Sequence, residues 1–209
     1  MVAVELWIAG AGGVGRETLD VAIAADRPVA GFLDDASAGA TVRDLPVWAM
    51  DDVPAGAVFL VAIGDPEARL RVAARLSAPP GTGRAGVAPA LVHPRAIVGP
   101  LTTLGAGCLV AGGAHVSSSV DLGDHTQVHY NATIGHDCVL AEGATVLPGA
   151  NIAGAVRLGR SCTVGSGAIV LQGLSVGDGA TVGAGAVVTR DVPAGSTVVG
   201  VPARSLDPR

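Results

Sequence analysis

The sequence predicts two parts with different architectures. Residues 1–78 are expected to form an α/β unit with a Rossmann-like strand–helix–strand pattern, and residues 92–193 a prism of short parallel β-strands. Two observations lead to this division: a glycine-rich turn between a strand pattern and a helix pattern near the start, and an apolar residue at every sixth position through the second part. The segment 79–91, rich in Gly, Pro and Ala, is expected to be a linker, and residues 194–209 a C-terminal tail.

The first part alternates strand and helix patterns. Apolar runs at 4–10, 29–33 and 57–64 are typical of buried strands, and helix patterns follow at 10–25 and 65–76. This is one half of a dinucleotide-binding fold, and no second nucleotide half follows it. We therefore expect it to hold the mononucleotide portion of a ligand. The alternative of a small NAD-dependent enzyme is disfavoured for the same reason.

A glycine-rich loop lies between the first strand and the first helix. Gly10, Gly12 and Gly15 complete the pattern G-x-G-x-x-G in the strand-to-helix context that phosphate binding requires. Amides at the start of a helix attract phosphate, and the glycines let a ligand approach closely. Asp34 follows the second strand, 22 residues after Gly12, where a carboxylate would bind ribose hydroxyls. A tight turn without a ligand is the alternative interpretation.

The second part is a six-residue repeat. Three short strands would make one coil of 18 residues, and successive coils would hydrogen-bond at a spacing of about 4.8 Å. The first residue of each hexad should point inward, and the residue four positions later is nearly always small. Cys108, Cys138 and Cys162 occupy this small position, so we expect core fillers rather than a disulfide or a nucleophile. The seventeen hexads, without a change of phase, begin at Val92, Val98, Leu104, Val110, Val116, Leu122, Val128, Ile134, Leu140, Val146, Ile152, Leu158, Val164, Val170, Val176, Val182 and Val188.

Composition excludes several classes of function. A net charge of −5, with 13 arginines and no lysine, argues against a nucleic-acid partner and excludes a lysine nucleophile. No stretch approaches the roughly 18 consecutive apolar residues of a membrane span, and the start MVAVELWIAGAGG lacks the basic region of a signal peptide. Three cysteines cannot all pair with one another, which favours the reducing cytoplasm.

His136 and Asp137 stand out among small and aliphatic neighbours. The third position of a hexad is neither the leader nor the small inward residue, so His136 should face outward. Asp137 could accept the Nδ1 proton and orient the ring, which would leave the other nitrogen as a general base. One coil later the chain has Gly154, near which a backbone N–H could stabilise an oxyanion. A surface histidine beside an unrelated carboxylate is the alternative that the residues alone leave open.

The hexads and the segment GHDCVLAEGATVLPGANIAG, followed by VRLG, resemble the sugar O-acyltransferase group of the hexapeptide acyltransferases. This group includes sialic acid O-acetyltransferases and bacterial nucleotide-sugar N-acetyltransferases. The resemblance covers essentially the whole chain, from GAGGVGR through FLDD and VAIG to GVPAR. It implies a left-handed parallel β-helix, a hand opposite to the usual crossover rule. It also implies a homotrimer with intersubunit active sites and acetyl-CoA as cosubstrate.

The resemblance also implies a role for each matching residue. His136 is the general base, Asp137 supports it, and Gly154 is the glycine whose amide faces the thioester carbonyl. Ser166 lines the CoA slot. The implied nucleotide-sugar site comprises residues of the glycine loop and residues that follow two strands: Gly10, Gly12, Gly13, Val14, Asp34, Asp35 and Gly64.

Three positions depart from the family pattern. Thr145 stands where many members have a second histidine that contacts acetyl-CoA, so the resemblance places it among the donor-binding residues. Val14 stands where some members have a loop histidine. His129 stands where many members have Asn, and His129 and the nearby Asn131 are candidate acceptor contacts.

The other histidines have structural interpretations. His93 is expected at the entry to the prism, and His115 and His125 at the surface or between subunits. Hexapeptide prisms also include zinc carbonic anhydrases, which need three converging histidines. His93 and His129 are two coils apart, but Ile134 stands where the third ligand is expected, so we expect no metal.

The sequence therefore predicts a cytoplasmic acetyltransferase that moves an acetyl group from acetyl-CoA to the amino group of a nucleotide-linked amino sugar. It is expected to act without nucleic-acid or membrane partners. Two alternatives remain open at this point. One is O-acetylation of a sialic acid or a related sugar hydroxyl, and the other is a non-catalytic scaffold that binds a nucleotide.

Overall fold

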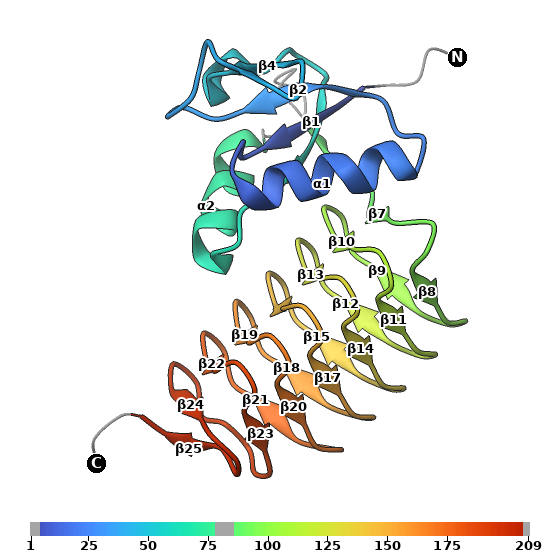
Figure 1. Ribbon diagram of the computed structural model, residues 1–209, viewed down its shortest axis with the longest axis vertical. Helices are drawn as coiled ribbons and strands as arrows, with labels where there is room; N and C mark the ends of the chain where they lie inside the picture. The colour runs from blue at the N-terminus through green and yellow to red at the C-terminus, as the bar shows by residue number, and fades with distance from the viewer. Residues whose placement is uncertain (1–4, 78–85, 207–209) are drawn as a thin grey trace.

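The computed structural model describes residues 5–77 and 86–206. Its first part contains a six-stranded sheet in the order β3-β4-β2-β1-β5-β6, parallel except for the β3–β4 hairpin. Figure 1 shows this unit above the coils of the second part. Its elements are β1 (Leu6–Ala9), α1 (Gly13–Ala24), β2 (Val29–Leu33), β3 (Thr41–Val42), β4 (Leu45–Trp48), the 3₁₀ helix η1 (Met50–Asp52), β5 (Val58–Val61), α2 (Pro66–Leu76) and β6 (Gly86–Val87).

The two helices cover opposite faces of the sheet. Ile8 and Phe32 pack in one apolar cluster with Leu19 of α1. The alternate residues Ala9 and Leu33 belong to a separate cluster that includes α2. Because successive side chains of a strand point to opposite faces, this arrangement follows from strands that are apolar throughout.

The strands and helices predicted for the first part are confirmed, but the β3–β4 hairpin is an addition to them. Its strands are two and four residues long, and β4 contains Pro46. Arg43 and Asp44 form the turn with positive φ angles of 52° and 64°, as two-residue hairpin turns require. Neither residue is glycine, which removes the usual sequence signal for such a turn.

The second part is a left-handed parallel β-helix. The strands β7 to β23 are two residues long, and together with β24 and β25 they stack into three sheets of eight, six and five strands. From β7 to β23, paired strand residues are 18 positions apart, as Val110 and Val128 are, so one coil has 18 residues as predicted. The strands from β7 to β23 end at the seventeen hexad leaders, from β7 (Leu91–Val92), β10 (Leu109–Val110), β13 (Gln127–Val128), β14 (Thr133–Ile134) and β16 (Thr145–Val146) to β23 (Val187–Val188).

The interior of the β-helix consists of the leaders and the small residues that follow them. Leaders from Val110 onward are at most 3% exposed, and the first three pack against this core as partly buried residues. Cys108, Cys138 and Cys162 are buried thiols, as predicted. Burial raises the pKa of Cys108 to about 11 and that of Cys162 to about 12, so both stay protonated and unreactive.

Strands also occur in the segments that the sequence treats as linker and tail. β6 extends the N-terminal sheet beside β5, and residues 79–85 of the expected linker lie outside the described residues. β24 (Thr197–Val199) pairs with β22 (Thr181–Val182) and continues the eight-stranded sheet. β25 (Arg204–Ser205) then closes that sheet as an antiparallel edge strand.

The N-terminal unit packs against the eight-stranded sheet. α1 contacts β7, and the buried Gln127 Nε2 donates to the carbonyl oxygen of Val61 at 3.2 Å. Leu70 of α2 lies against the turn at Gly143, where a Cβ would be 2.9 Å from a Leu70 methyl carbon. In the described ranges, no helix is long and apolar enough to cross a membrane.

Candidate active site

His136 and Asp137 lie on the turn that follows β14. The His136 Nδ1 is 2.7 Å from the Asp137 Oδ2, and the two side chains are 58% and 63% exposed. Asp137 has a left-handed φ of 59°, which a short polar side chain tolerates. With Nδ1 bonded to a carboxylate, Nε2 is the nitrogen available to an incoming group.

Gly154 lies directly against the His136 ring, as the 18-residue coil predicts. A Cβ on Gly154 would be 2.7 Å from both Cε1 and Nε2 of His136, so no larger residue fits without moving the imidazole. The Gly154 amide has no acceptor among the described residues, whereas the next amide, that of Ala155, donates to the His136 carbonyl at 2.7 Å. One corner of the β-helix thus presents an oriented imidazole and a free N–H side by side.

The glycine loop is open to solvent at its centre and tightly packed at its ends. A Cβ on Gly12 or Gly13 would meet nothing within 4 Å. A Cβ on Gly10, whose φ is 108°, would be 2.8 Å from the Ala62 carbonyl oxygen, and one on Gly15 would collide with the Gly10 carbonyl. The loop therefore rests closely on the end of β5, while the first turn of α1 keeps an open face with unpaired amides, as an anion site requires.

Asp34 and Asp35 follow β2 at the same edge of the sheet. The Asp34 carboxylate accepts from the amide of Ala11 at 2.9 Å, which ties it to the glycine loop, and from the amide of Ala36 at 3.0 Å. Asp35 accepts from the amide of Met50 at 2.9 Å and pairs with Arg75 at 2.5 Å. These contacts, the backbone bond first, hold the pKa of Asp35 below its usual value.

Gly64 follows β5 at the same edge and lies beside Val14. A Cβ placed on Gly64 would be 3.7 Å from a methyl carbon of Val14. The structure therefore brings together the residues predicted for the nucleotide site at the carboxyl ends of three parallel strands. Ligands of open α/β sheets bind at this edge.

His129 is buried in the joint between the two parts of the chain. It is 4% exposed, its Nε2 has no partner among the described residues, and it lines a cleft of about 190 Å³ with Glu17, Asp20 and Tyr130. Burial, and secondarily the charge of Arg69, lowers its pKa to about 4, so the ring is neutral at physiological pH.

Thr145 does not reach His136. It lies on β16 in the eight-stranded sheet and is fully buried, and its Oγ1 accepts from a terminal nitrogen of Arg69 at 2.6 Å. The assignment of Thr145 to the acyl donor is therefore at odds with its position, because the N-terminal unit covers it. Asn131 is exposed on the turn after β13 with a φ of 57°, and Ser166 is exposed after β19 (Thr163–Val164).

The remaining histidines are His115 and His93, which have surface or local contacts, and His125, which is buried. His115 is exposed on β11 (His115–Val116), and the Nδ1 of His93 accepts from the amide of Arg95 at 2.9 Å, a local structural contact. Of the two positions expected for His125, the surface or a subunit interface, the surface is wrong: His125 is 6% exposed, and its backbone carbonyl accepts from the buried Arg69 of α2. Among the described residues, no group of three or more His, Cys, Asp or Glu side chains could hold a metal ion.

One residue of this region has no role in the sequence interpretation. Arg69 of α2 is fully buried and donates to both parts of the chain. The available signal is its spacing, because Arg69, Ala73 and Leu76 form the buried stripe of the helix at intervals of four and three residues.

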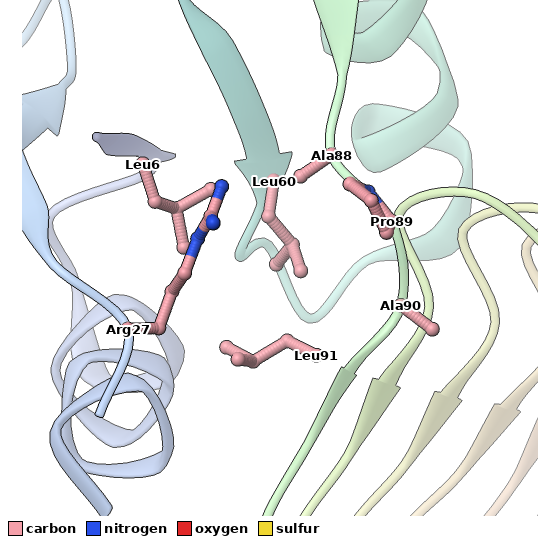
Figure 2. Close-up of a pocket in the computed structure, with 7 residues that line it drawn as sticks. All are labelled: Leu6, Arg27, Leu60, Ala88, Pro89, Ala90 and Leu91. Carbon is pink, nitrogen blue, oxygen red and sulfur yellow. The ribbon is translucent and has the colours of Figure 1, made fainter. Parts of the chain in front are cut away.

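Figure 2 shows a separate cavity of about 130 Å³ beside the amino ends of β1 and β2. Arg27 extends toward Leu6 and Leu60 there, and the other walls are apolar. The glycine loop and Asp34 follow the carboxyl ends of these strands. No residue predicted for substrate binding lines this cavity.

Comparisons with known proteins agree with both parts of the fold. Residues 5–76 match the PglD N-terminal domain family, and residues 155–190 match the hexapeptide repeat of succinyl-transferase. No curated protein matches the chain.

Several solved structures are similar over nearly the whole chain. The acetyltransferase domain of PglB from Neisseria gonorrhoeae is 33% identical over 97% of this chain and 100% of that one, with a TM-score of 0.90. A mutant of perosamine N-acetyltransferase from Caulobacter crescentus, solved with CoA and GDP-perosamine, is 27% identical over 98% and 97%, with a TM-score of 0.88. WeeI from Acinetobacter baumannii is 28% identical over 97% and 99%, with a TM-score of 0.87. The chain belongs to the hexapeptide-repeat sugar acyltransferase family, among the members that join a PglD-type N-terminal domain to a left-handed β-helix.

Proposed function

We propose that this protein transfers the acetyl group of acetyl-CoA to the amino group of a nucleotide-linked amino sugar, with His136 as the general base. The observation that carries the proposal is the corner formed by His136, Asp137 and Gly154. It combines a proton acceptor, a carboxylate that orients it and an unpaired amide. The similar enzyme from C. crescentus is a perosamine N-acetyltransferase, and the similar PglB domain has been solved with acetyl-CoA.

The chemistry follows from these positions. The amine nitrogen attacks the thioester carbonyl carbon, and the carbonyl oxygen becomes an oxyanion that the Gly154 N–H stabilises. The Nε2 of His136 takes the proton that the attacking nitrogen loses, while Asp137 stabilises the resulting imidazolium. The carbon–sulfur bond then breaks, and CoA leaves as a thiolate that can recover the proton. Ser166 is assigned to the slot that holds CoA.

The N-terminal unit, residues 1–78, would hold the nucleotide, while the β-helix over 92–193 carries the transfer chemistry. The open amides at Gly12, Gly13 and Val14 suit the phosphates. Asp34 is assigned to a ribose hydroxyl, and its carboxylate, which already accepts from two amides, has further lone pairs for that bond.

The active site is proposed to lie between subunits of a homotrimer. Within one chain His136 and Asp137 stand on an open corner, whereas the cleft beside His129 is one strand away along the same coil. A groove that excludes water from the base therefore needs a neighbouring β-helix. The neutral His129, with its unpaired Nε2, and the exposed Asn131 are candidate contacts for the acceptor sugar. Three buried free cysteines suit the reducing cytoplasm, where we place the reaction.

The test is thiol release from acetyl-CoA with a panel of acceptors. The panel contains UDP- and GDP-linked 4-amino sugars, the same amino sugars without a nucleotide, and sialic acid. Release with a nucleotide-linked amine, reduced at least about 100-fold in His136→Ala, is the expected result. His115→Ala, which changes an exposed histidine on another strand, should match the wild type.

Three other results of these measurements would each replace part of the proposal. Release with hydroxyl acceptors alone would replace this proposal with O-acetylation. No release from any acceptor by the folded protein would favour a nucleotide-binding scaffold. A light-scattering mass equal to one chain would exclude the trimer.

A further inference from the structure

Arg69 is the bulkiest fully buried side chain in the described part of the protein, and it lies where the two parts of the chain meet. Its backbone belongs to α2 of the N-terminal unit, and its guanidinium reaches the turns of the β-helix. A buried arginine has to satisfy five N–H donors in a rigid planar fork. The partners of these donors therefore show what the residue holds together.

All five donors have acceptors, and the acceptors come from both parts. In the N-terminal unit, Nη1 donates to the carbonyl oxygens of Ile63 at 2.8 Å and Gly64 at 3.4 Å. In the β-helix, Nε donates to the carbonyl of His125 at 2.9 Å. Nη2 donates to the Gly143 carbonyl and to Thr145 Oγ1, each at 2.6 Å. One side chain thus joins the end of β5 to two successive turns of the β-helix.

These two turns belong to the coils that carry the proposed transfer chemistry. His125 and Gly143 are 18 residues apart and occupy equivalent turns, as do His136 and Gly154. His136 follows His125 by eleven positions, and Gly154 follows Gly143 by eleven positions. Gly64, on the other side of the arginine, is one of the residues predicted to contact the nucleotide sugar. The arginine therefore links the nucleotide edge to the level of the base along the β-helix.

The charge of Arg69 is hydrogen-bonded only to dipoles, and the carboxylate of Asp65 favours it from a greater distance. None of the ion pairs in the described ranges includes it, and desolvation lowers its pKa only to about 10, so it stays protonated. Carbonyl oxygens and a hydroxyl at fixed distances offer little tolerance for displacement, because a shift of either part would leave a buried donor unsatisfied. A lysine, with three donors on a flexible stem, cannot reproduce this arrangement.

We propose that Arg69 is a positioning residue that fixes the nucleotide-binding edge at one height along the β-helix axis, level with His136 and Gly154. The acceptor amine of a nucleotide-linked substrate then arrives at the height of the base. This inference rests on the proposed function, because it concerns the geometry of that same transfer.

The test compares Arg69→Lys, Arg69→Met and Thr145→Val with Arg71→Met, which changes an exposed arginine of the same helix. With a nucleotide-linked amino sugar, kcat should fall about 10- to 100-fold in the Arg69 variants, because misplacement by about 1 Å costs this much. It should fall severalfold in Thr145→Val. The KM for acetyl-CoA and the Kd for the free nucleotide should change less than about twofold, because neither ligand spans the joint. Acetylation of the same amino sugar without a nucleotide should be unaffected.

A purely structural role has a different signature. It predicts a lower melting temperature with the wild-type kcat in the folded fraction, and that result would overturn the proposal. If the Arg69 variants do not fold, Thr145→Val decides, because it removes a single acceptor and keeps the shape of the side chain. Wild-type protein without activity on any nucleotide-linked amine would instead remove the proposed function itself.

Discussion

His129 and His136 lie on one coil, seven residues apart, in opposite environments. His129 is 4% exposed, no carboxylate pairs with it, and burial holds its pKa near 4. The side chain of His136 is 58% exposed and bonds to Asp137 at 2.7 Å. His129 can offer a neutral ring to a ligand but does not take up a second proton at neutral pH, whereas the Nδ1 of His136 is bonded to a carboxylate. The contrast shows that neighbours, rather than residue type, decide which histidine can serve as the base.

Removing the Asp137 carboxylate should have the largest effect, because it removes the main difference between His136 and His129. Asp137→Asn leaves His136 without a charged partner, as His129 is now, and we expect kcat to fall about 100-fold. The fold should be unaffected, because Asn also tolerates the left-handed φ of 59°. Steady-state kinetics with a nucleotide-linked amine measures the loss, and a rate within threefold of the wild type would refute the role of Asp137.

Acidification should lower the free energy of unfolding because His129 is buried in the neutral form. The pKa of His129 is near 4 when folded and 6.5 as the unfolded reference, so the unfolded chain binds more protons between these values. Stability should therefore be complete above pH 6.5 and should decrease as the pH falls toward 4, by roughly 2 kcal/mol between pH 7 and pH 5. His129→Gln should lack this component in urea unfolding at the two pH values. Identical pH dependence in both proteins would contradict the burial argument.

A methyl group on Gly154 should displace the base without changing the fold. Its Cβ would lie 2.7 Å from the His136 ring, and the exposed imidazole can rotate away. We expect Gly154→Ala to lower kcat about tenfold while the melting temperature stays within a few degrees of the wild type. Gly86→Ala is the control for a methyl group added at a glycine, because there is open space around its Cβ. Gly149 does not serve, because its φ of 68° would strain an alanine.

The smallest expected effect is at the glycine loop. Gly12 has an ordinary φ of −75° and open space around its Cβ, so Gly12→Ala should leave the stability within about 0.5 kcal/mol of the wild type. If the open space is occupied by the phosphates of the substrate, the KM for the nucleotide sugar should still rise severalfold. Unchanged stability together with an unchanged KM would place the phosphates elsewhere.

The β-helix could be predicted residue by residue because its period converts sequence position into geometry. The inward leaders, the buried cysteines and the stacking of Gly154 on His136 all follow from coils of 18 residues. The glycine loop was equally accessible, since strand, glycines and helix occur in a fixed order.

The joint between the two parts could not be predicted in this way. Arg69 bonds to residues 56 and 74 positions away, and no local pattern encodes such a separation. The burial of Thr145 and His125 has the same origin, because outward positions of a coil become interior only where another unit covers them.

The coil register has a further consequence for substrate choice. Because paired strand residues of successive coils are 18 positions apart, a His–Asp pair and its facing glycine moved by 18 positions along the sequence would occupy the same corner of the β-helix, about 4.8 Å further along its axis. The position of a site along the β-helix axis can therefore change only in steps of one coil. If the proposed function holds, the coil that carries the base, counted from the turns held by Arg69, sets how far an amine can stand from the bound nucleotide and still be acetylated. Sugar length could then change in evolution in steps of one coil.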